Sequence, residues 1–287
     1  MERLWFITNP ASGTATQAKC DALEAVFAER GLTLAGRTRF PEAAMPRPDE
    51  LAAAVVDTVV LFAGDGTINA ALCALAEWDG AFLILPGGTM NLLARALHGT
   101  AEPHAIVHAA HRCDRRVALP MVEAGGHRAF VGMILGPAAS WFRAREAVRG
   151  RRPGRLVAAV RAGWRRTFGD PGVRVAGAGL AARYQAVFVT PDADGLDVAA
   201  VDARDWRTIA ELGWEWLTGD WVAARAVDCA RAAALSLQAP RRVLALVDGE
   251  PVTLTAGTTI RLGHSRRHFL ATAEVSGTAA GQGKAAA

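Results

Sequence analysis

Short apolar runs alternate with stretches of helical periodicity over the first part of the chain. The run at 58–64 is apolar on both faces, which is typical of an inner strand in a parallel sheet covered by helices. Strands are predicted at residues 3–10, 32–40, 58–64 and 81–86, and helices at 15–31, 49–56 with Asp49 as cap, 67–77, 89–97 and 102–112. This alternation predicts a doubly wound α/β domain over residues 1–116.

From Arg116 onward the pattern changes to short strand candidates separated by glycines. The candidates lie at 115–135, 173–190, 196–202, 225–239, 241–254 and 258–263, with helices expected near 140–168 and 205–218. A mainly antiparallel β-sandwich domain over residues 117–275 fits this pattern, and a return of its last strand to the first domain stays open. The small, polar tail at 276–287 is typical of a disordered terminus.

Composition agrees with a two-domain globular protein. The chain has 287 residues, of which 51% are hydrophobic and 21% charged, and this length favours two cores over one. A formal net charge of +4 favours anionic partners without choosing among phosphates, membranes and nucleic acids. The absence of a signal pattern, of an uncharged bilayer-length stretch and of paired cysteines predicts a cytoplasmic setting with reduced thiols.

Three glycine-containing turns each follow a strand and precede a helix. They read "TNPASGTA" at 8–15, "AGDGT" at 63–67 and "PGGTMN" at 86–91. Glycines let backbone amides approach an anion, a following helix adds its positive end, and such turns share one edge of a doubly wound sheet. The three turns predict a phosphate-rich ligand, although the P-loop and dinucleotide signatures are missing and plain connecting turns are the alternative.

Asp65 lies between two glycines in the second of these turns. A carboxylate among phosphates is repelled unless a divalent cation lies between them, and Mg²⁺ prefers one or two carboxylates together with phosphate oxygens. With Thr67 and Asn69 nearby, we interpret Asp65 as linked to a bound metal. The alternative is an aspartate that forms the turn with its own side chain.

Four motifs in this order resemble the diacylglycerol kinase catalytic family. They are "NPASG" at 9–13, "AGDGTIN" at 63–69, "PGGTMNLLARAL" at 86–97 and "DGE" at 248–250, and their spacing agrees over nearly the whole chain. The family includes bacterial lipid kinases, sphingosine kinases and ceramide kinases, and is distantly related to NAD kinases. The resemblance implies an NAD-kinase-like α/β domain, a C-terminal β-sandwich, and ATP with Mg²⁺ bound in the cleft between them.

The resemblance also implies specific site residues. The nucleotide-binding set is Asn9, Pro10, Ser12, Gly13, Thr38, Gly64, Asp65, Gly66, Thr67, Ile68, Asn69, Ala70, Gly88, Thr89 and Asn91. Glu250 takes the general-base position, with Asp248 beside it and Asp65 as the third catalytic residue; without the family, "DGE" reads as a hairpin turn. Besides Asp65, the implied metal ligands are the Asp194 side chain and the backbone carbonyls of Pro191 and Leu196, which would hold a structural cation.

The chain departs from the family pattern at three positions. Ala63 replaces a glycine, which is tolerated if its φ is negative, while Leu92 and Ala118 replace aspartates that help to build the magnesium network in several bacterial members. Losing two acids leaves Asp65 with less support for a metal. A sluggish or specialised kinase therefore stays open.

Two further segments carry candidate chemistry. The stretch from Trp141 to Phe168 has nine arginines and one glutamate among apolar and aromatic residues, which favours docking on an anionic membrane over a solvated face or a nucleic-acid patch. His104, His108 and His111 share one face of a predicted helix, with Cys113 near. Zinc binding is possible in principle, but a half-buried helix face is favoured.

Together these observations predict a cytoplasmic kinase, peripheral on the inner face of the membrane, that uses ATP and Mg²⁺. Its acceptor would be a hydroxyl of diacylglycerol or a related lipid at the membrane surface; no nucleic-acid partner is expected, and a homodimer stays open. The alternatives are a sphingoid or ceramide kinase, a catalytically weakened regulator that binds nucleotide or lipid, and a soluble kinase of NAD type.

Overall fold

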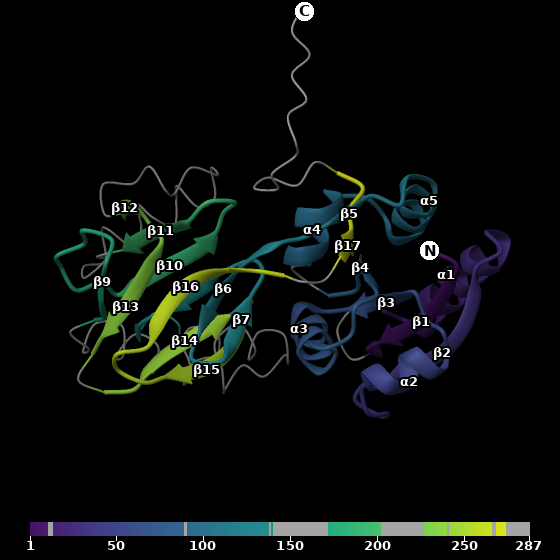
Figure 1. Cartoon of the computed structure of the whole chain (residues 1–287), viewed down its shortest axis with the longest axis horizontal. Helices are drawn as coiled ribbons and strands as arrows, with labels where there is room; N and C mark the ends of the chain where they lie inside the picture. The colour runs from purple at the N-terminus through teal and green to yellow at the C-terminus, as the bar shows by residue number, and fades with distance from the viewer. Residues whose placement is uncertain are drawn as a thin grey trace, which may run out of the picture. The chain divides into compact units, whose positions relative to one another are not determined.

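A computed structural model describes residues 1–10, 14–88, 91–137, 139, 172–201, 227–239, 241–265 and 268–273. They form two compact units, one of Met1–Pro120 with the segment from His264 onward, the other of Met121–Gly263 (Figure 1). The first unit thus extends to Pro120 rather than to residue 116. The second ends at Gly263 rather than at residue 275, because the last strand belongs to the first unit. The predicted tail at 276–287 lies outside the described residues.

The first unit is built on one six-stranded sheet. Its strands are β1 (Arg3–Thr8), β2 (Thr33–Arg39), β3 (Thr58–Ala63), β4 (Ala81–Pro86), β17 (His268–Leu270) and β5 (Arg116–Val117). The order is β2-β1-β3-β4-β17-β5, and all neighbours are parallel except β17 and β5. The helices are α1 (Gln17–Glu29), α2 (Pro48–Ala53), α3 (Asp65–Ala74), α4 (Leu92–His98) and α5 (Pro103–Cys113). The predicted doubly wound α/β fold is confirmed.

Both faces of the central strands are buried. On one face, α1 and α5 pack over alternate strand residues such as Phe6 and Phe62, and the Phe6 ring meets Phe27 of α1 edge-on at 5.3 Å. The residues between them, such as Val59 and Phe82, point to the opposite face and are also buried, which leaves α2, α3 and α4 to cover that face. Strand β3, buried at all six positions, is therefore the centre of this core.

All five helices begin one to three residues away from the predicted starts, as α2, α3 and α4 illustrate. Helix α2 has Arg47 rather than Asp49 as its N-cap, because Pro48 takes the first helical position, which proline favours. Helix α3 begins at Asp65, two residues earlier than the sequence pattern suggests. Helix α4 begins at Leu92 because Asn91 has a left-handed backbone conformation, with φ of 53°.

The second unit consists of two mainly antiparallel sheets. One has the order β12-β11-β10-β8-β14-β15 and the other β7-β6-β16-β13-β9. The strands are β6 (Pro120–Ala124), β7 (His127–Ala129), β8 (Met133–Leu135), β9 (Arg174–Ala176), β10 (Ala186–Pro191), β11 (Leu196–Val201), β12 (Val227–Ala232), β13 (Ala234–Gln238), β14 (Val243–Val247), β15 (Glu250–Leu254) and β16 (Thr259–His264).

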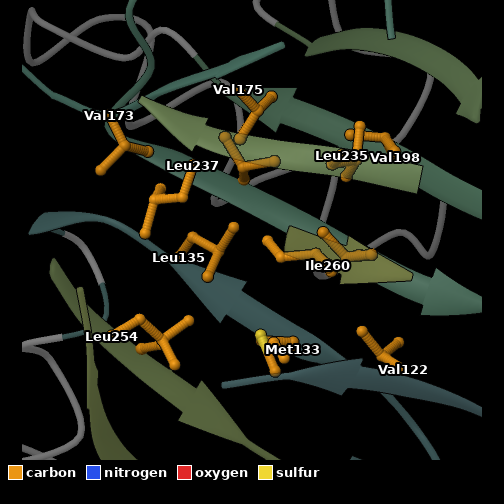
Figure 2. Packing of buried hydrophobic residues seen from close by; sticks show 14 of the residues in the cluster. Val122, Met133, Leu135, Val173, Val175, Val198, Leu235, Leu237, Leu254 and Ile260 are labelled. Atoms are coloured by element: carbon orange, nitrogen blue, oxygen red, sulfur yellow. The ribbon is translucent and has the colours of Figure 1, made fainter. Parts of the chain in front are cut away.

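A single apolar cluster joins these two sheets. Figure 2 shows side chains of both sheets in it, among them Val122 and Ile260 from one, and Met133 and Leu254 from the other. Each such fully buried aliphatic side chain contributes about 1.5–3 kcal/mol relative to exposure. The predicted β-sandwich is confirmed, while the helices expected near 140–168 and 205–218 lie outside the described residues.

Within the described part of the chain, none of the helices combines the length and the apolar character needed to span a bilayer.

Candidate functional site

The three glycine turns of the first unit meet at the carboxyl ends of β1, β3 and β4. The Asn9 side-chain amide donates to the Thr67 hydroxyl at 2.8 Å, and its backbone amide donates to the Phe62 carbonyl at 3.4 Å. The Thr14 amide donates to the Gly87 carbonyl at 3.2 Å. The turn after β1 therefore contacts both of the other turns.

The turns after β3 and β4 touch through their backbones. The Gly87 amide donates to the Ala63 carbonyl at 3.2 Å. A Cβ atom at Gly87 would lie 2.5 Å from the Ala63 nitrogen, and one at Gly88 would lie 2.6 Å from the Gly64 Cα. Both positions consequently require glycine for this close approach, whatever ligand binds. Ala63 itself lies in β3 and is not among the positive-φ residues, as its replacement of glycine demands.

Asn91 closes the third turn by two bonds to the same residue. Its side-chain oxygen accepts from the Gly88 amide at 2.6 Å, and its side-chain nitrogen donates to the Gly88 carbonyl at 3.0 Å. The left-handed backbone of Asn91 makes this clamp possible, because asparagine tolerates that conformation better than most residues. Thr89, which the resemblance places on the nucleotide, lies outside the described residues, as do Ser12 and Gly13.

Asp65 caps the helix that follows the third turn. Its Oδ1 accepts from the Leu92 amide at 2.8 Å, so the carboxylate faces the positive end of α4. Burial raises the pKa of Asp65, while the amides of Leu92, Leu93 and Asn91 act in the opposite direction. This contact joins residues 27 positions apart and has no signal in the sequence. The carboxylate therefore binds a protein group as well, which the interpretation of Asp65 as metal-linked did not include.

The donor set of these turns fits a phosphate chain. Some of the backbone amides already donate within the protein, namely those of Asn9, Thr14, Gly87, Gly88 and Leu92. The donors that favour an anion at this edge of the sheet are therefore the first amides of α3, which have no partner within the helix. A carboxylate offers about four acceptor positions, so Asp65 can keep its α4 partner and still face an ion. Mg²⁺ bound mainly by phosphates and water with a single carboxylate matches the usual preference of that ion. The residues present therefore fit both a phosphate chain and a bound Mg²⁺ ion.

The remaining predicted nucleotide contacts have varied surroundings. Thr38 is 4% exposed, and its hydroxyl accepts from the Trp5 indole at 3.0 Å. Ile68 is 2% exposed and belongs to the core, whereas Ala70 is exposed to solvent. The Asn69 side-chain oxygen accepts from the Cys73 thiol at 3.4 Å. Pro10 and the half-buried Gly64 belong to the turns, whereas the half-buried Gly66 lies in the first turn of α3. Nucleotide contact by these residues stays a prediction.

The "DGE" motif forms a tight hairpin in the second unit. Asp248 and Gly249 connect β14 to β15 with φ values of 46° and 88°, the pattern of a type I′ turn. The Asp248 carboxylate is 8% exposed and accepts three consecutive amides, from Phe130 at 2.9 Å, Val131 at 2.9 Å and Gly132 at 3.0 Å. Glu250, the first residue of β15, is exposed.

These contacts give the two acidic residues of the motif different roles. Asp248 fixes the loop between β7 and β8, a positioning role that sequence reasoning missed because its partners lie more than 100 positions earlier. Glu250 is exposed, so the fold leaves it accessible to a substrate hydroxyl. Its catalytic assignment stays a prediction.

The predicted cation turn lies between β10 and β11. Pro191 ends β10 opposite Leu196, which begins β11, and the Asp192 amide donates to the Gly195 carbonyl at 2.9 Å. Arg231 of β12 lies over this turn, 2.6 Å from Asp192 and 3.7 Å from Asp197. The Ala193 amide and Arg231 together lower the pKa of Asp192. A positive side chain thus already sits beside the turn, and a cation held by Pro191, Asp194 and Leu196 stays a prediction.

The histidines of α5 and the basic segment complete the predicted candidates. The Arg30 side chain donates from Nε to Nδ1 of His108 at 2.6 Å. The described ranges contain no group of three or more histidine, cysteine or acidic side chains placed to hold a metal ion. The segment from Trp141 to Phe168 lies outside the described residues.

Comparison with known proteins supplies an independent line of evidence. Residues 3–121 match the family model of the diacylglycerol kinase catalytic domain. No curated protein matches the chain. Among solved structures, one assigned as a diacylglycerol kinase of Bacillus anthracis str. Sterne has a TM-score of 0.67 at 18% identity, covering 96% of this chain and 98% of its own. A second structure, also of a diacylglycerol kinase from that strain, has a TM-score of 0.62 at 16% identity, with the same coverage. At these identities the structures show a common fold.

Proposed function

The chain is a member of the diacylglycerol kinase catalytic family through its residues 3–121, and on this premise we propose that it phosphorylates a lipid. The γ-phosphoryl group of ATP, bound with Mg²⁺, would pass to a hydroxyl of diacylglycerol or of a related sphingoid or ceramide lipid. The observation that carries the proposal is the meeting of three glycine turns, joined by the Asn9–Thr67 and Gly87–Ala63 bonds. These contacts bring the start of α3 beside the other two turns, and the first amides of a helix suit a polyphosphate.

The residues divide the work of phosphoryl transfer between them. That reaction depends on positioning and charge neutralisation more than on covalent help from the protein. The glycine turns hold the phosphates, Asp65 keeps α4 pointed at them, and Mg²⁺, when bound, neutralises charge on the phosphate oxygens. Glu250 accepts the proton of the lipid hydroxyl, which contributes about 10²–10⁴-fold. Asp248 holds the neighbouring loop in shape.

Radiolabelled ATP with Mg²⁺ and a total lipid extract tests this proposal. We expect one labelled lipid, separated by thin-layer chromatography, and no label on NAD added as a soluble acceptor. Glu250→Gln should abolish labelling while nucleotide affinity, measured by calorimetry, stays within about twofold. Full turnover by that variant would remove Glu250 from the role of base, and labelled NAD would replace the lipid acceptor by a soluble one.

A regulator that binds nucleotide or lipid without catalysis is the second candidate. Leu92 and Ala118 replace family acids, and the carboxylates of Asp65 and Asp248 both accept backbone amides. ATP binding without any labelled product across the extract and several divalent ions would favour this reading.

Membrane attachment is a further part of the proposal. The nine arginines from Trp141 to Phe168 would hold the protein on the anionic inner face of the membrane, each worth about 1 kcal/mol near such a surface. Sedimentation with phosphatidylglycerol vesicles should recover the protein, and about 0.5 M salt should release it because screening weakens the attraction. Equal recovery on phosphatidylcholine vesicles would argue against this electrostatic docking.

A further inference from the structure

A cavity of about 320 Å³ lies between α1 and α5. These two helices pack on one face of the first sheet, and their positions in the fold are labelled in Figure 1. This α1–α5 groove lies within the first unit, and none of its lining residues belongs to the predicted nucleotide set. Its volume is at the lower end of the range for small-molecule sites. A small ligand, rather than a peptide or a whole two-chain lipid, matches that size.

The floor of the groove is apolar. Leu23 of α1 and Phe62 of β3 line it, with 3% and 1% of their surface exposed, and Val26 adds a half-buried aliphatic wall. Because Leu23 and Phe62 are fixed in the core, the floor keeps its shape without a ligand. An aliphatic chain laid on this floor would remove its own apolar surface, and part of that of Val26, from water.

Lys19, His104 and His108 line the rim of the groove, and each can donate a hydrogen bond. Lys19 contributes an ammonium group, and His108 lines the groove while its Nδ1 accepts from Arg30 Nε at 2.6 Å. A neutral imidazole that accepts at Nδ1 carries its proton at Nε2, so Arg30 fixes His108 as a donor at that atom. Glu102 is the one acidic residue of the lining, and it penalises a head group with two negative charges.

We propose that the α1–α5 groove binds a short single-chain amphiphile with a carboxylate head group, such as a medium-chain fatty acid. The chain lies on Leu23, Val26 and Phe62, and the two carboxylate oxygens match two of the donors, Lys19 and His108. A single charge suits a rim that contains one ammonium and one carboxylate. The site is independent of the kinase reaction, so it stands or falls separately from the proposed function.

Calorimetric titration of decanoate into the full chain, below the concentration at which decanoate forms micelles, tests the proposal. We expect saturable binding with one site. Lys19→Gln should weaken it about tenfold, the loss expected for one charged hydrogen bond, and Glu102→Gln should strengthen it several-fold. Decanol, which keeps the chain but lacks the charge, should bind at least about tenfold more weakly.

A pair of variants on α1 separates groove binding from general surface adsorption. Ala22 lines the groove, whereas Ala25 is exposed on the same helix and does not. Ala22→Trp should fill the groove and abolish binding, and Ala25→Trp should leave it unchanged, with equal thermal unfolding showing that both variants fold. Absence of saturable binding to the unaltered chain, equal loss in both tryptophan variants, or equal affinity for decanol would overturn the proposal. Tighter binding of decyl phosphate would overturn the assignment of a carboxylate head group.

Discussion

Val55 occupies a backbone conformation that its side chain disfavours. It follows α2 with a φ of 53°, and the bonds from Val55 to Ala52 and from Val56 to Leu51 form a Schellman motif, in which glycine is usual. A β-branched residue there is strained, and its side chain is 73% exposed, so it gains little from packing. Val55→Gly should therefore raise the free energy of unfolding by about 1 kcal/mol in urea denaturation.

Val55→Ala is the matched control, because alanine keeps the Cβ atom that causes the strain. It should change stability by less than about 0.5 kcal/mol. If Val55→Gly is destabilising, the left-handed conformation is not strained as argued.

His98 makes the stability of the first unit dependent on pH. Its imidazole is 4% exposed and contacts the Thr272 hydroxyl at 3.0 Å, and burial lowers its pKa from 6.5 to about 4. Below pH 6.5 the unfolded chain therefore takes up this proton while the folded protein does not. The contribution of His98 is complete above pH 6.5 and falls by about 3 kcal/mol as the pH drops toward 4.

The measurement is the midpoint of urea unfolding between pH 7 and pH 4. His98→Asn keeps a polar partner for Thr272 but does not titrate, so its profile should be flatter over that range. His104→Asn, at an exposed position of α5, should keep the full slope. Equal slopes in the two variants would show that other groups cause the acid sensitivity.

The structural role of a residue was predictable from the sequence where that role depends on local chemistry. The glycines at 87 and 88 and the turn-forming pair Asp248–Gly249 have the conformations or close contacts that their residue types suggest. The partner of each acid was not predictable. Asp65 reaches α4, and Asp248 reaches a loop in another hairpin, through contacts that only the folded chain creates.

At the scale of elements, the Asp248 side chain connects the β14–β15 hairpin to the loop before β8. Asp248→Asn keeps the turn, because asparagine tolerates positive φ, but replaces one acceptor oxygen with an amide group that faces a backbone N–H. We expect a loss of about 1–3 kcal/mol in stability of the second unit. Glu250→Gln, at an exposed site on the same hairpin, should cost less than about 0.5 kcal/mol.

Hydrogen exchange followed residue by residue measures this prediction. Asp248→Asn should reduce amide protection at Phe130, Val131 and Gly132 before it affects distant strands. Unchanged protection at these three amides would mean that the carboxylate does not fix the loop.

Strand positions followed the hydrophobic pattern closely, whereas helix starts did not. The strand predicted at 81–86 has the same bounds as β4, because a short run that is buried on both faces is typical of an inner strand. Helix α4 begins three residues later than periodicity indicates, because Asn91 leaves the helical conformation to clamp Gly88. The start of α4 thus depends on a side-chain contact within the turn before it rather than on helix propensity alone.

At the scale of the whole molecule, the two-unit organisation was predictable from the change in rhythm near Arg116. The path of the last strand was only partly predictable. After β16 of the second unit, the chain returns to place β17 between β4 and β5, with Phe269 beside Phe82. A short apolar segment such as "HFL" carries no information about which sheet it joins, since pairing partners are decided by tertiary packing.

Because of this return, the stability of the first unit should depend on the C-terminal end of the chain. Phe269 is fully buried, its ring centre lies 5.8 Å from that of Phe82, and Phe82 in turn packs edge-on against Trp78 at 5.3 Å. Phe269→Ala should cost about 3–5 kcal/mol, the usual range for truncating a buried phenylalanine. His268→Ala, the exposed neighbour in the same strand, should cost little.

Hydrogen exchange resolves the loss by unit. In Phe269→Ala, amides of β3 and β4 should lose protection together, because these strands share the core that β17 completes, while β10 and β14 of the second unit should keep theirs. Equal loss in both units would mean that they unfold as one cooperative body. Protection lost only in β10 and β14 would contradict the placement of β17 in the first sheet.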